Sequence, residues 1–356
     1  SASPDYRGEA RSPQTEDWMA VTAAATREAT GAGALDRLLA ATHDEMLKVN
    51  TLILERAQSH VDMVPELARY LIDAGGKRLR PMLTVAAAQL YGRSIGEHVN
   101  FAAAVEFLHN ATLLHDDVVD ESDMRRGRPA ARMIWGNQAS VLVGDFLLGQ
   151  AFMMMVETAN VPALEVIARA ATIIAEGEVF QLSKAKDLAT SAADYDEIIG
   201  AKTAMLFQAA TEVGAMAGGA DEAGRQALRD YGRELGMAFQ LVDDVLDYRG
   251  ESGTMGKNAG DDLREGKMTL PVILALAEAN PAEREIVASS LGRADANETT
   301  LSQVVAIMNR HRTLARTLEK AETHVQNARA ALASVPDGEM KTLLSDIAEF
   351  YVSRAY

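Results

Sequence analysis

The stretch that decides the fold is Leu114 to Pro129, which reads LHDDVVDESDMRRGRP. It places a cluster of carboxylates at the end of a predicted helix and three arginines directly after it. Asp116 and Asp120 are four residues apart, so their side chains lie on one face of that helix, one turn apart. Like charges repel there, and a helix C-terminus already carries partial negative charge. The arrangement costs stability unless a cation offsets it.

A second acidic cluster of the same pattern lies downstream, in Gln240 to Asp247, which reads QLVDDVLD. Each cluster follows an apolar run, and the two form a weak duplication rather than a periodic array. Paired carboxylates are hard oxygen ligands that suit Mg²⁺ or Mn²⁺, and both ions favour sites shared with substrate phosphates. One cluster alone is equally well explained as a solvated helix end. Two copies favour a metal and diphosphate site between them.

Composition indicates a helical protein with ample material for a core. The chain has 356 residues, of which 48% are hydrophobic and only 5% aromatic. Its net charge of -16 argues against nucleic acid or an anionic membrane as the main partner. There is no cysteine, which excludes disulfides and thiolate metal sites. We expect no membrane-spanning run and no signal peptide, and therefore a cytoplasmic protein without stable membrane insertion.

Hydrophobic periodicity predicts one all-α domain over residues 34–356, preceded by a mobile extension over residues 1–33. A mobile glycine loop is expected at 250–262, and no linker divides the middle of the domain. The expected helices are 34–58, 65–72, 81–90, 97–120, 137–158, 162–186, 193–217, 221–248, 268–279, 281–291, 299–317, 318–334 and 338–352.

Basic residues supply a possible counterpart to the acidic clusters. Gly75 to Pro81 reads GGKRLRP and puts three cations after a flexible glycine pair, where free backbone N–H groups can also meet an anion. Taken alone, this stretch is better explained as a helix end followed by surface charges. A lone histidine such as His109, or a lone lysine such as Lys202, is also weak evidence by itself.

Together these motifs resemble the trans-isoprenyl diphosphate synthases, which elongate prenyl chains head to tail. The resemblance covers the chain from about residue 35 to the C-terminus and rests on residues 75–81, 113–129, 202–203, 239–247 and 256–267. It implies an all-α isoprenoid synthase fold around a deep central cavity, and a homodimer. It also implies a prenyltransferase that adds isopentenyl diphosphate to an allylic diphosphate.

The resemblance further implies a set of site residues and about three Mg²⁺ ions per active site, with Mn²⁺ possible. The implied metal residues are Asp116, Asp117 and Asp120, with Asp117 in support, and Asp243, Asp244 and Asp247, with Asp243 as the direct ligand. The implied site for isopentenyl diphosphate is Lys77, Arg80, His109 and Arg126. The implied grip on the allylic diphosphate is Arg125, Lys202, Lys257 and Lys267. Thr203 and Gln240 are implied near the reacting carbons, and the implied catalytic set is Asp116, Asp120, Lys202, Thr203, Gln240 and Asp243.

Product length is expected to depend on the helix that leads into the first cluster. In the family that the chain resembles, bulky aromatics four and five residues before the first Asp stop the growing chain. Thr112 and Ala111 occupy those positions here, and both are small. This favours a long product, octaprenyl to decaprenyl diphosphate, which is a precursor of the ubiquinone side chain. Phe107 and Leu108 lie one turn deeper, where either could close the tunnel earlier and give a geranylgeranyl-type product.

Three other hypotheses are weaker. A class I terpene cyclase shares the fold that the resemblance implies, but usually replaces the second Asp-rich motif and lacks the isopentenyl site. A non-catalytic regulatory subunit would be expected to lose metal ligands or basic residues, and none is missing here. A ferritin-like dimetal protein needs Glu-x-x-His pairs on facing helices. The stretch His43-Asp44-Glu45 has the wrong order and spacing for that.

Overall fold

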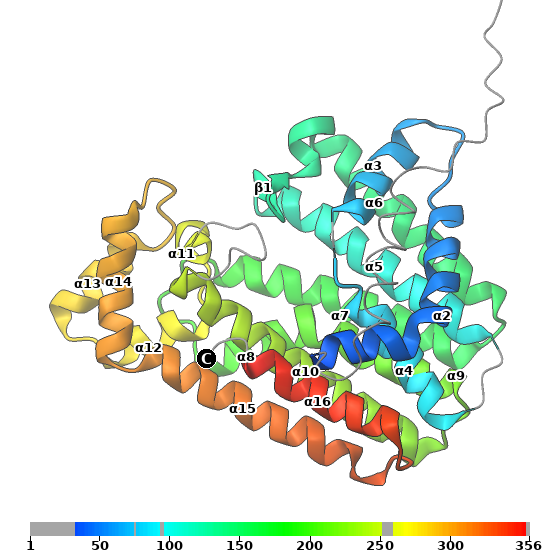
Figure 1. The fold of residues 1–356 in the computed structure, drawn as a ribbon. Helices are drawn as coiled ribbons and strands as arrows, with labels where there is room; N and C mark the ends of the chain where they lie inside the picture. Colours follow the sequence, from blue (N-terminus) through cyan, green and yellow to red (C-terminus); the bar gives the residue numbers. More distant parts are fainter. Residues whose placement is uncertain (1–32, 75, 93–95, 251–258, 354–356) are drawn as a thin grey trace, which may run out of the picture.

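The computed structural model describes residues 33–74, 76–92, 96–250 and 259–353, and within these ranges the regular structure is almost entirely helical (Figure 1). This confirms the predicted all-α fold. The elements are α2 Ala34–Arg56, α3 Met63–Asp73, α4 Leu79–Tyr91, α5 Glu97–Val119, β1 Met124–Arg125, β2 Arg128–Pro129, α6 Ala131–Glu157, α7 Val161–Lys184, α8 Ala192–Ile199, η1 Gly200–Ala204, α9 Met205–Ala217, α10 Glu222–Arg249, α11 Asp261–Glu265, α12 Leu270–Glu278, α13 Pro281–Ser290, α14 Glu298–Arg310, α15 Thr313–Ala331, η3 Leu332–Ser334 and α16 Glu339–Ser353. Of the predicted extension only Gly33 is described, and residues 251–258 of the predicted glycine loop lie outside the described ranges.

Helix α5 is the buried axis of the fold. Its consecutive residues Ala102, Ala103 and Ala104 are all fully buried. Successive side chains point about 100° apart around a helix, so three in a row can be buried only if the helix is enclosed. Helices α2, α4, α6 and α9 supply that enclosure (Figure 1). The helix that carries the first acidic cluster at its end is therefore enclosed on every side along its middle.

Helix α10 carries the second acidic cluster and is almost as well buried. Its N-cap is Asp221, whose Oδ1 accepts a hydrogen bond from the Gly224 N–H at 2.8 Å. The helix packs against α9 on one side and against α15 on another (Figure 1). It ends at Gly250, whose φ of 73° is a left-handed C-cap that suits glycine. These ends confirm the predicted helix over 221–248 to within about a residue.

The predicted helix over 193–217 is wrong in one respect, because a π-helical turn divides it. The turn η1 spans Gly200–Ala204, between α8 and α9, and carries Lys202 and Thr203. Glycines of two flanking helices lie against it. A Cβ added to Gly177 of α7 would lie 2.6 Å from the Ala201 Cβ, and one added to Gly236 of α10 would lie 2.6 Å from the Ala204 Cα. The two helices thus pack closely against a backbone form that is uncommon in proteins.

The predicted boundary between helices 299–317 and 318–334 is also wrong. Helix α14 ends at Arg310 and α15 already begins at Thr313. Arg312 has a φ of 55°, which breaks the helix, and the preceding His311 ring forms a 2.8 Å hydrogen bond with the Glu283 carboxylate of α13. This contact joins residues 28 positions apart. Hydrophobic periodicity carries no information on such a long-range contact.

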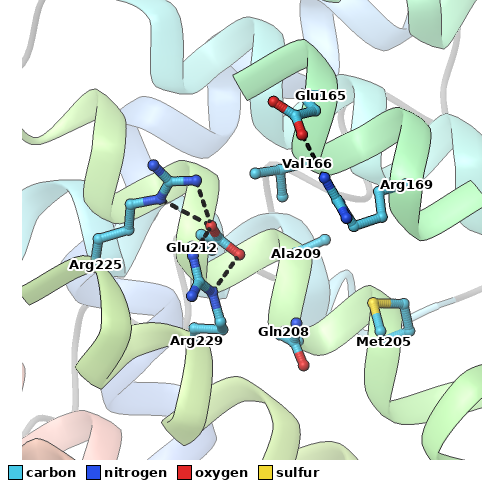
Figure 2. A pocket seen from close by; sticks show the side chains of 9 residues that line it. All are labelled: Glu165, Val166, Arg169, Met205, Gln208, Ala209, Glu212, Arg225 and Arg229. Carbon is cyan, nitrogen blue, oxygen red and sulfur yellow. Dashed lines mark hydrogen bonds and ion pairs between the residues drawn. The ribbon is translucent and has the colours of Figure 1, made fainter. Parts of the chain in front are cut away.

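A cluster of ion pairs links α9 to the first part of α10. The Glu212 carboxylate accepts hydrogen bonds from Arg225 Nε at 2.8 Å and from Arg229 Nε at 3.0 Å, and Figure 2 shows both guanidinium groups directed at it. A separate exposed pair, Arg169 with Glu165, lies across the same cavity. The cavity holds about 310 Å³ and is lined by Glu165, Val166, Arg169, Met205, Gln208, Ala209, Glu212, Arg225 and Arg229. None of these residues belongs to the acidic clusters, so we regard the cluster as a structural link.

The sequence analysis expected no apolar run long enough to span a membrane, and helix α6 contradicts that expectation. Among the described residues it is the single helix long and apolar enough to do so by length and composition, with a mean hydropathy of 1.7 over its most apolar window. The sequence prediction missed it because polar residues such as Asp145 interrupt the run. Buried core helices of soluble proteins meet the same criterion, and 39% of the window is buried. The finding is weak evidence for a membrane span.

Candidate active site

The three aspartates of the first cluster have different environments. Asp117 points into the protein and is fully buried, with Oδ1 accepting from Arg125 Nε at 2.8 Å and Nη2 at 2.7 Å. Asp116 and Asp120 are only partly buried. Asp117 and Arg125 together fix the chain just after the end of α5. The two remaining carboxylates keep the one-turn spacing that the sequence predicted.

Two lysines offset the repulsion between these carboxylates. Lys202 Nζ lies 3.7 Å from Asp116 Oδ2, and Lys267 Nζ donates to Asp120 Oδ2 at 3.1 Å. Burial raises the pKa of Asp116, and Lys202 opposes that rise. Burial alone would lower the pKa of Lys267, but Asp262, Asp120 and Glu265 raise it well above the usual value. Both lysines are therefore held charged beside the carboxylates.

In the second cluster, Asp244 is held by neutral donors. Asp244 is buried, and its two carboxylate oxygens accept from Tyr195 Oη at 2.6 Å and from Gln240 Nε2 at 2.7 Å. The Gln240 carbonyl in turn accepts from Thr203 Oγ1 at 2.8 Å. Asp247 is also buried and accepts from the Asp262 backbone N–H at 3.3 Å. This leaves Asp243 as the more exposed member of the cluster.

The π-turn η1 connects the two clusters. Its Lys202 reaches Asp116 of the first cluster, and the next residue, Thr203, reaches Gln240 beside the second. Consecutive residues of one turn thus contact carboxylate clusters that lie more than 120 positions apart in the chain. The structure therefore brings the two clusters together, as the sequence analysis predicted. The predicted residues Lys202, Thr203 and Gln240 lie between them.

The predicted basic residues gather at the N-terminal end of α4 and beside α5. Arg80 Nη1 lies 3.3 Å from His109 Nε2, and the Arg80 guanidinium lies over the Phe207 ring at 4.4 Å. Burial lowers the pKa of Arg80 to about 10, and burial with the nearby arginines lowers the pKa of His109 well below its usual value. A Cβ added to Gly76 would lie 2.9 Å from Arg126 Nη1, so that glycine admits the Arg126 side chain. Lys77, also predicted, is exposed.

The predicted chain-length residues lie in the part of α5 that precedes Asp116. Ala111, Phe107 and Leu108 are buried in the core. Thr112 is half-buried, and its hydroxyl donates to the His109 carbonyl at 2.7 Å. The side chain at 112 is therefore both small and tied back to the helix. Lys257, the remaining predicted site residue, lies outside the described residues.

Several site residues were missed by the sequence analysis. Glu178 of α7 accepts from Lys202 Nζ at 2.9 Å, Tyr195 of α8 binds Asp244, and Asp262 of α11 lies beside Asp247. Asp262 is part of a stretch that the resemblance quoted, but no role was given to it. Glu178 and Tyr195 are single residues in helices without a motif. Their role depends on contacts over 24 and 49 positions, which no local pattern reveals.

The donor set fits a magnesium-type ion that is shared with a substrate. Asp116, Asp120 and Asp243 offer oxygen ligands only, as Mg²⁺ prefers. Within the described ranges, no group of three or more His, Asp or Glu side chains converges closely enough to hold an ion alone. Mg²⁺ is commonly held by one or two carboxylates together with water and phosphate oxygens. The geometry is therefore compatible with ions that bind together with a diphosphate.

Comparison with known proteins finds similarity over most of the chain. The family model for polyprenyl synthetase matches residues 61–308. Octaprenyl diphosphate synthase of Haemophilus influenzae is 42% identical, over 90% of this chain and 98% of that protein. A decaprenyl diphosphate synthase from Rhodobacter capsulatus is 50% identical with a TM-score of 0.86, covering 90% of this chain and 99% of that one. A polyprenyl synthase from Caulobacter crescentus, complexed with calcium and isoprenyl diphosphate, is 52% identical with a TM-score of 0.87, covering 91% and 99%.

The raised pKa of Asp244 predicts how the stability of the protein depends on pH. Burial and the neighbouring Asp262 raise its pKa to about 7, against about 3.9 in an unfolded chain. Protonation then favours the folded state, so this residue reduces the free energy of unfolding as pH rises from about 4 to about 7. We expect Asp244→Asn to remove this loss. In metal-free buffer, the stability of the variant relative to the wild type should increase from about pH 5 to about pH 8, as measured by urea unfolding.

Asp230→Asn, at an exposed position of the same helix, is the control and should follow the wild type at every pH. A constant offset between Asp244→Asn and the wild type is allowed, because it reports rearranged hydrogen bonds. Parallel curves for the two proteins across the range would contradict the raised pKa.

Proposed function

The chain belongs to the polyprenyl synthetase family, and from this premise we propose that it makes a long all-trans polyprenyl diphosphate, octaprenyl to decaprenyl in length. It does so by adding isopentenyl diphosphate head to tail to an allylic diphosphate. The observation that carries the proposal is the pair of acidic clusters bridged by η1, with the small residues Ala111 and Thr112 before the first of them. Similarity to octaprenyl and decaprenyl diphosphate synthases supports the long product.

The two diphosphates bind to different basic groups in this proposal. Arg125, Lys202, Lys257 and Lys267 hold the allylic diphosphate, and Lys77, Arg80, His109 and Arg126 hold that of isopentenyl diphosphate. The described contacts support this division. Lys202 and Lys267 contact the first acidic cluster, whereas Arg80 pairs with His109. The lowered pKa of His109 keeps its ring neutral near pH 7, so it acts there as a hydrogen-bond donor.

About three Mg²⁺ ions, or Mn²⁺ in their place, act as cofactors in the proposal. Asp116, Asp120 and Asp243 are the direct ligands, and Asp117, Asp244 and Asp247 act in support, in keeping with their burial and hydrogen bonds. The Caulobacter structure with calcium and isoprenyl diphosphate supports a divalent ion as part of the complex. When bound, such ions make the allylic diphosphate a better leaving group.

In the proposed reaction one C–O bond breaks and one C–C bond forms, and side chains of the site stabilise the charges that develop. The C–O bond of the allylic diphosphate breaks and leaves an allylic cation, with Lys202 and Lys267 neutralising the charge on the departing diphosphate. The isopentenyl double bond attacks that cation, and a new C–C bond forms. The isopentenyl unit loses a proton, which the released diphosphate accepts. The oxygen dipoles of Thr203 and Gln240, fixed by their mutual hydrogen bond, stabilise positive charge near the reacting carbons.

We also propose a homodimer that covers the exposed apolar face of α6 and α7. Large apolar side chains on these two helices are more than a third exposed, namely Met133, Ile134, Val141, Leu142, Met153 and Val156 on α6 and Val161, Val179 and Leu182 on α7. Groups of exposed large apolar side chains are typical of protein interfaces. A second copy that covers it accounts for the hydropathy of α6 without a membrane.

The remaining proposals concern context. Residues 34–356 act as one synthase domain, in keeping with the continuous buried core from Leu38 to Val352. The enzyme is cytoplasmic, and its product supplies the ubiquinone side chain.

A direct assay tests the proposed function. Purified protein with Mg²⁺, farnesyl diphosphate and labelled isopentenyl diphosphate should form polyprenyl diphosphates of eight to ten units, in the range named by its relatives. Chelation with EDTA should abolish incorporation, and added Mg²⁺ should restore it, because the diphosphate charge is then neutralised. Product length is read by chromatography after dephosphorylation. No incorporation under any metal would refute the synthase, and a single cyclic hydrocarbon would favour a cyclase.

Chain length is tested separately. Ala111→Phe places a bulky ring one turn before the first cluster and should shorten the products by several isoprene units while condensation continues. Ala111→Val is a smaller change at the same position and should shorten them less. Product distributions are compared under the conditions of the direct assay. If both variants yield products of wild-type length, Ala111 does not border the growing chain, and Phe107 or Leu108 becomes the next candidate.

The dimer is tested by charge placement. Leu142→Asp together with Leu182→Asp should convert the dimer to a monomer, because two carboxylates on each copy would be buried without partners. The control is Val61→Asp, at a position just before α3 that is 50% exposed and lies outside the α6–α7 face. Molar mass is measured by light scattering on a size-exclusion column. A wild-type protein that is already monomeric, or a double variant that stays dimeric, would rule out this face as the interface.

A further inference from the structure

Glu178 occupies a place in the site that no motif assigns. Its carboxylate accepts from Lys202 Nζ at 2.9 Å, which is closer than the 3.7 Å between the same ammonium group and Asp116. The side chains of Glu178 and Lys202 are 22% and 23% exposed, so their contact lies at the edge of the site and not on the outer surface. Lys202 is thus held between one carboxylate of the first acidic cluster and one carboxylate of α7.

The backbone is built to allow this contact. Gly177, the residue before Glu178, lies against η1, and a Cβ there would meet the Ala201 Cβ at 2.6 Å and the Lys202 N at 3.2 Å. Any larger residue at 177 would push α7 away from the π-turn. The glycine therefore lets α7 approach η1 closely, one residue before Glu178 contacts Lys202. The π-turn supplies the other half, because it sets the direction of the Lys202 side chain.

Glu178 differs from Asp116 in what happens to it during catalysis. In the proposed function Asp116 is a metal ligand, so its oxygens are directed at an ion when substrate binds. Its hold on Lys202 then weakens, and a lysine side chain with four rotatable bonds is poorly fixed by one distant partner. Glu178 lies on a different helix from the acidic clusters and is not a metal ligand in the proposed function, so we expect its 2.9 Å contact with Lys202 to persist. One of the three ammonium hydrogens satisfies Glu178, and the others remain for the diphosphate.

We propose that Glu178 is a positioning residue that aims Lys202 at the departing allylic diphosphate. This inference rests on the proposed function, which assigns Lys202 to that diphosphate. Glu178 acts through Lys202 and does not touch the reacting atoms. Its negative charge also repels the bound diphosphate, so it weakens substrate binding while it improves the alignment of the lysine. Loss of Glu178 should therefore lower the reaction rate without weakening the binding of the allylic diphosphate.

The opposite effects of Glu178 on substrate binding and on rate can be measured in variants. Glu178→Gln keeps the shape but loses the charge, and it should lower the rate of the first condensation by about tenfold or more. KM for the allylic diphosphate should fall, because a repulsive charge is gone. Glu178→Asp, which retains the charge on a shorter stem, should recover part of the rate. Glu176→Gln, at an exposed position of the same helix, is the matched control and should behave as the wild type.

Rates are measured in single turnovers with farnesyl diphosphate, so that slow product release does not mask the chemical step, and thermal unfolding checks that each variant is folded. A structural defect would reduce the active fraction and leave KM unchanged in the remaining enzyme. It would also fail to explain recovery by Glu178→Asp.

A double-mutant cycle with Lys202→Ala completes the test. If Glu178 acts through Lys202, Glu178→Gln should change the rate little further once Lys202 is removed. Additive losses would overturn the proposal, as would a wild-type rate for Glu178→Gln in an enzyme that Lys202→Ala impairs. In both cases the proposed function would stand. A Lys202→Ala enzyme with wild-type kinetics would instead refute the assignment of Lys202 itself, and the role of Glu178 with it.

Discussion

The repulsion between Asp116 and Asp120 is the constraint on which the site depends. Both lie at the C-terminal end of α5, where the helix dipole adds to the negative charge. Lys202 and Lys267 offset it, and each comes from a segment far along the chain. The lysine positions in turn require η1 and the Gly266 turn to lie beside α5. Charge balance at one helix end therefore specifies where two distant segments of the fold must be.

Close backbone packing positions those two segments beside α5. Gly177 and Gly236 allow α7 and α10 to approach η1 from two sides. At Gly266, whose φ is 76°, an added Cβ would lie 2.8 Å from Lys186 Cγ, so the residue just before Lys267 is fixed by a similar contact. Larger side chains at these positions would push the helices apart and displace the lysines. Electrostatic interactions at 3 to 4 Å are sensitive to such shifts.

Local patterns were sufficient to predict most of the fold and part of the site. Apolar periodicity predicted α10, and the one-turn spacing predicted that Asp116 and Asp120 share a face. Tyr195 and Glu178 could not be predicted, because their partners are fixed only by tertiary packing. The π-turn was missed for a related reason. Its Gly-Ala-Lys-Thr-Ala sequence is compatible with an ordinary helix, and glycines of two other helices pack against it.

The two acidic clusters share a sequence pattern but differ in how the protein compensates them. Ammonium and guanidinium groups of Lys202, Lys267 and Arg125 balance the first. In the second, Asp244 accepts from the neutral Tyr195 hydroxyl and Gln240 amide, and Asp247 accepts from a backbone N–H. Neutral donors orient a carboxylate without cancelling its charge, so burial raises the pKa of Asp244 to about 7. Equivalent positions of one motif can thus differ electrostatically, because Asp117 pairs with a guanidinium group whereas Asp244 accepts from a hydroxyl and an amide.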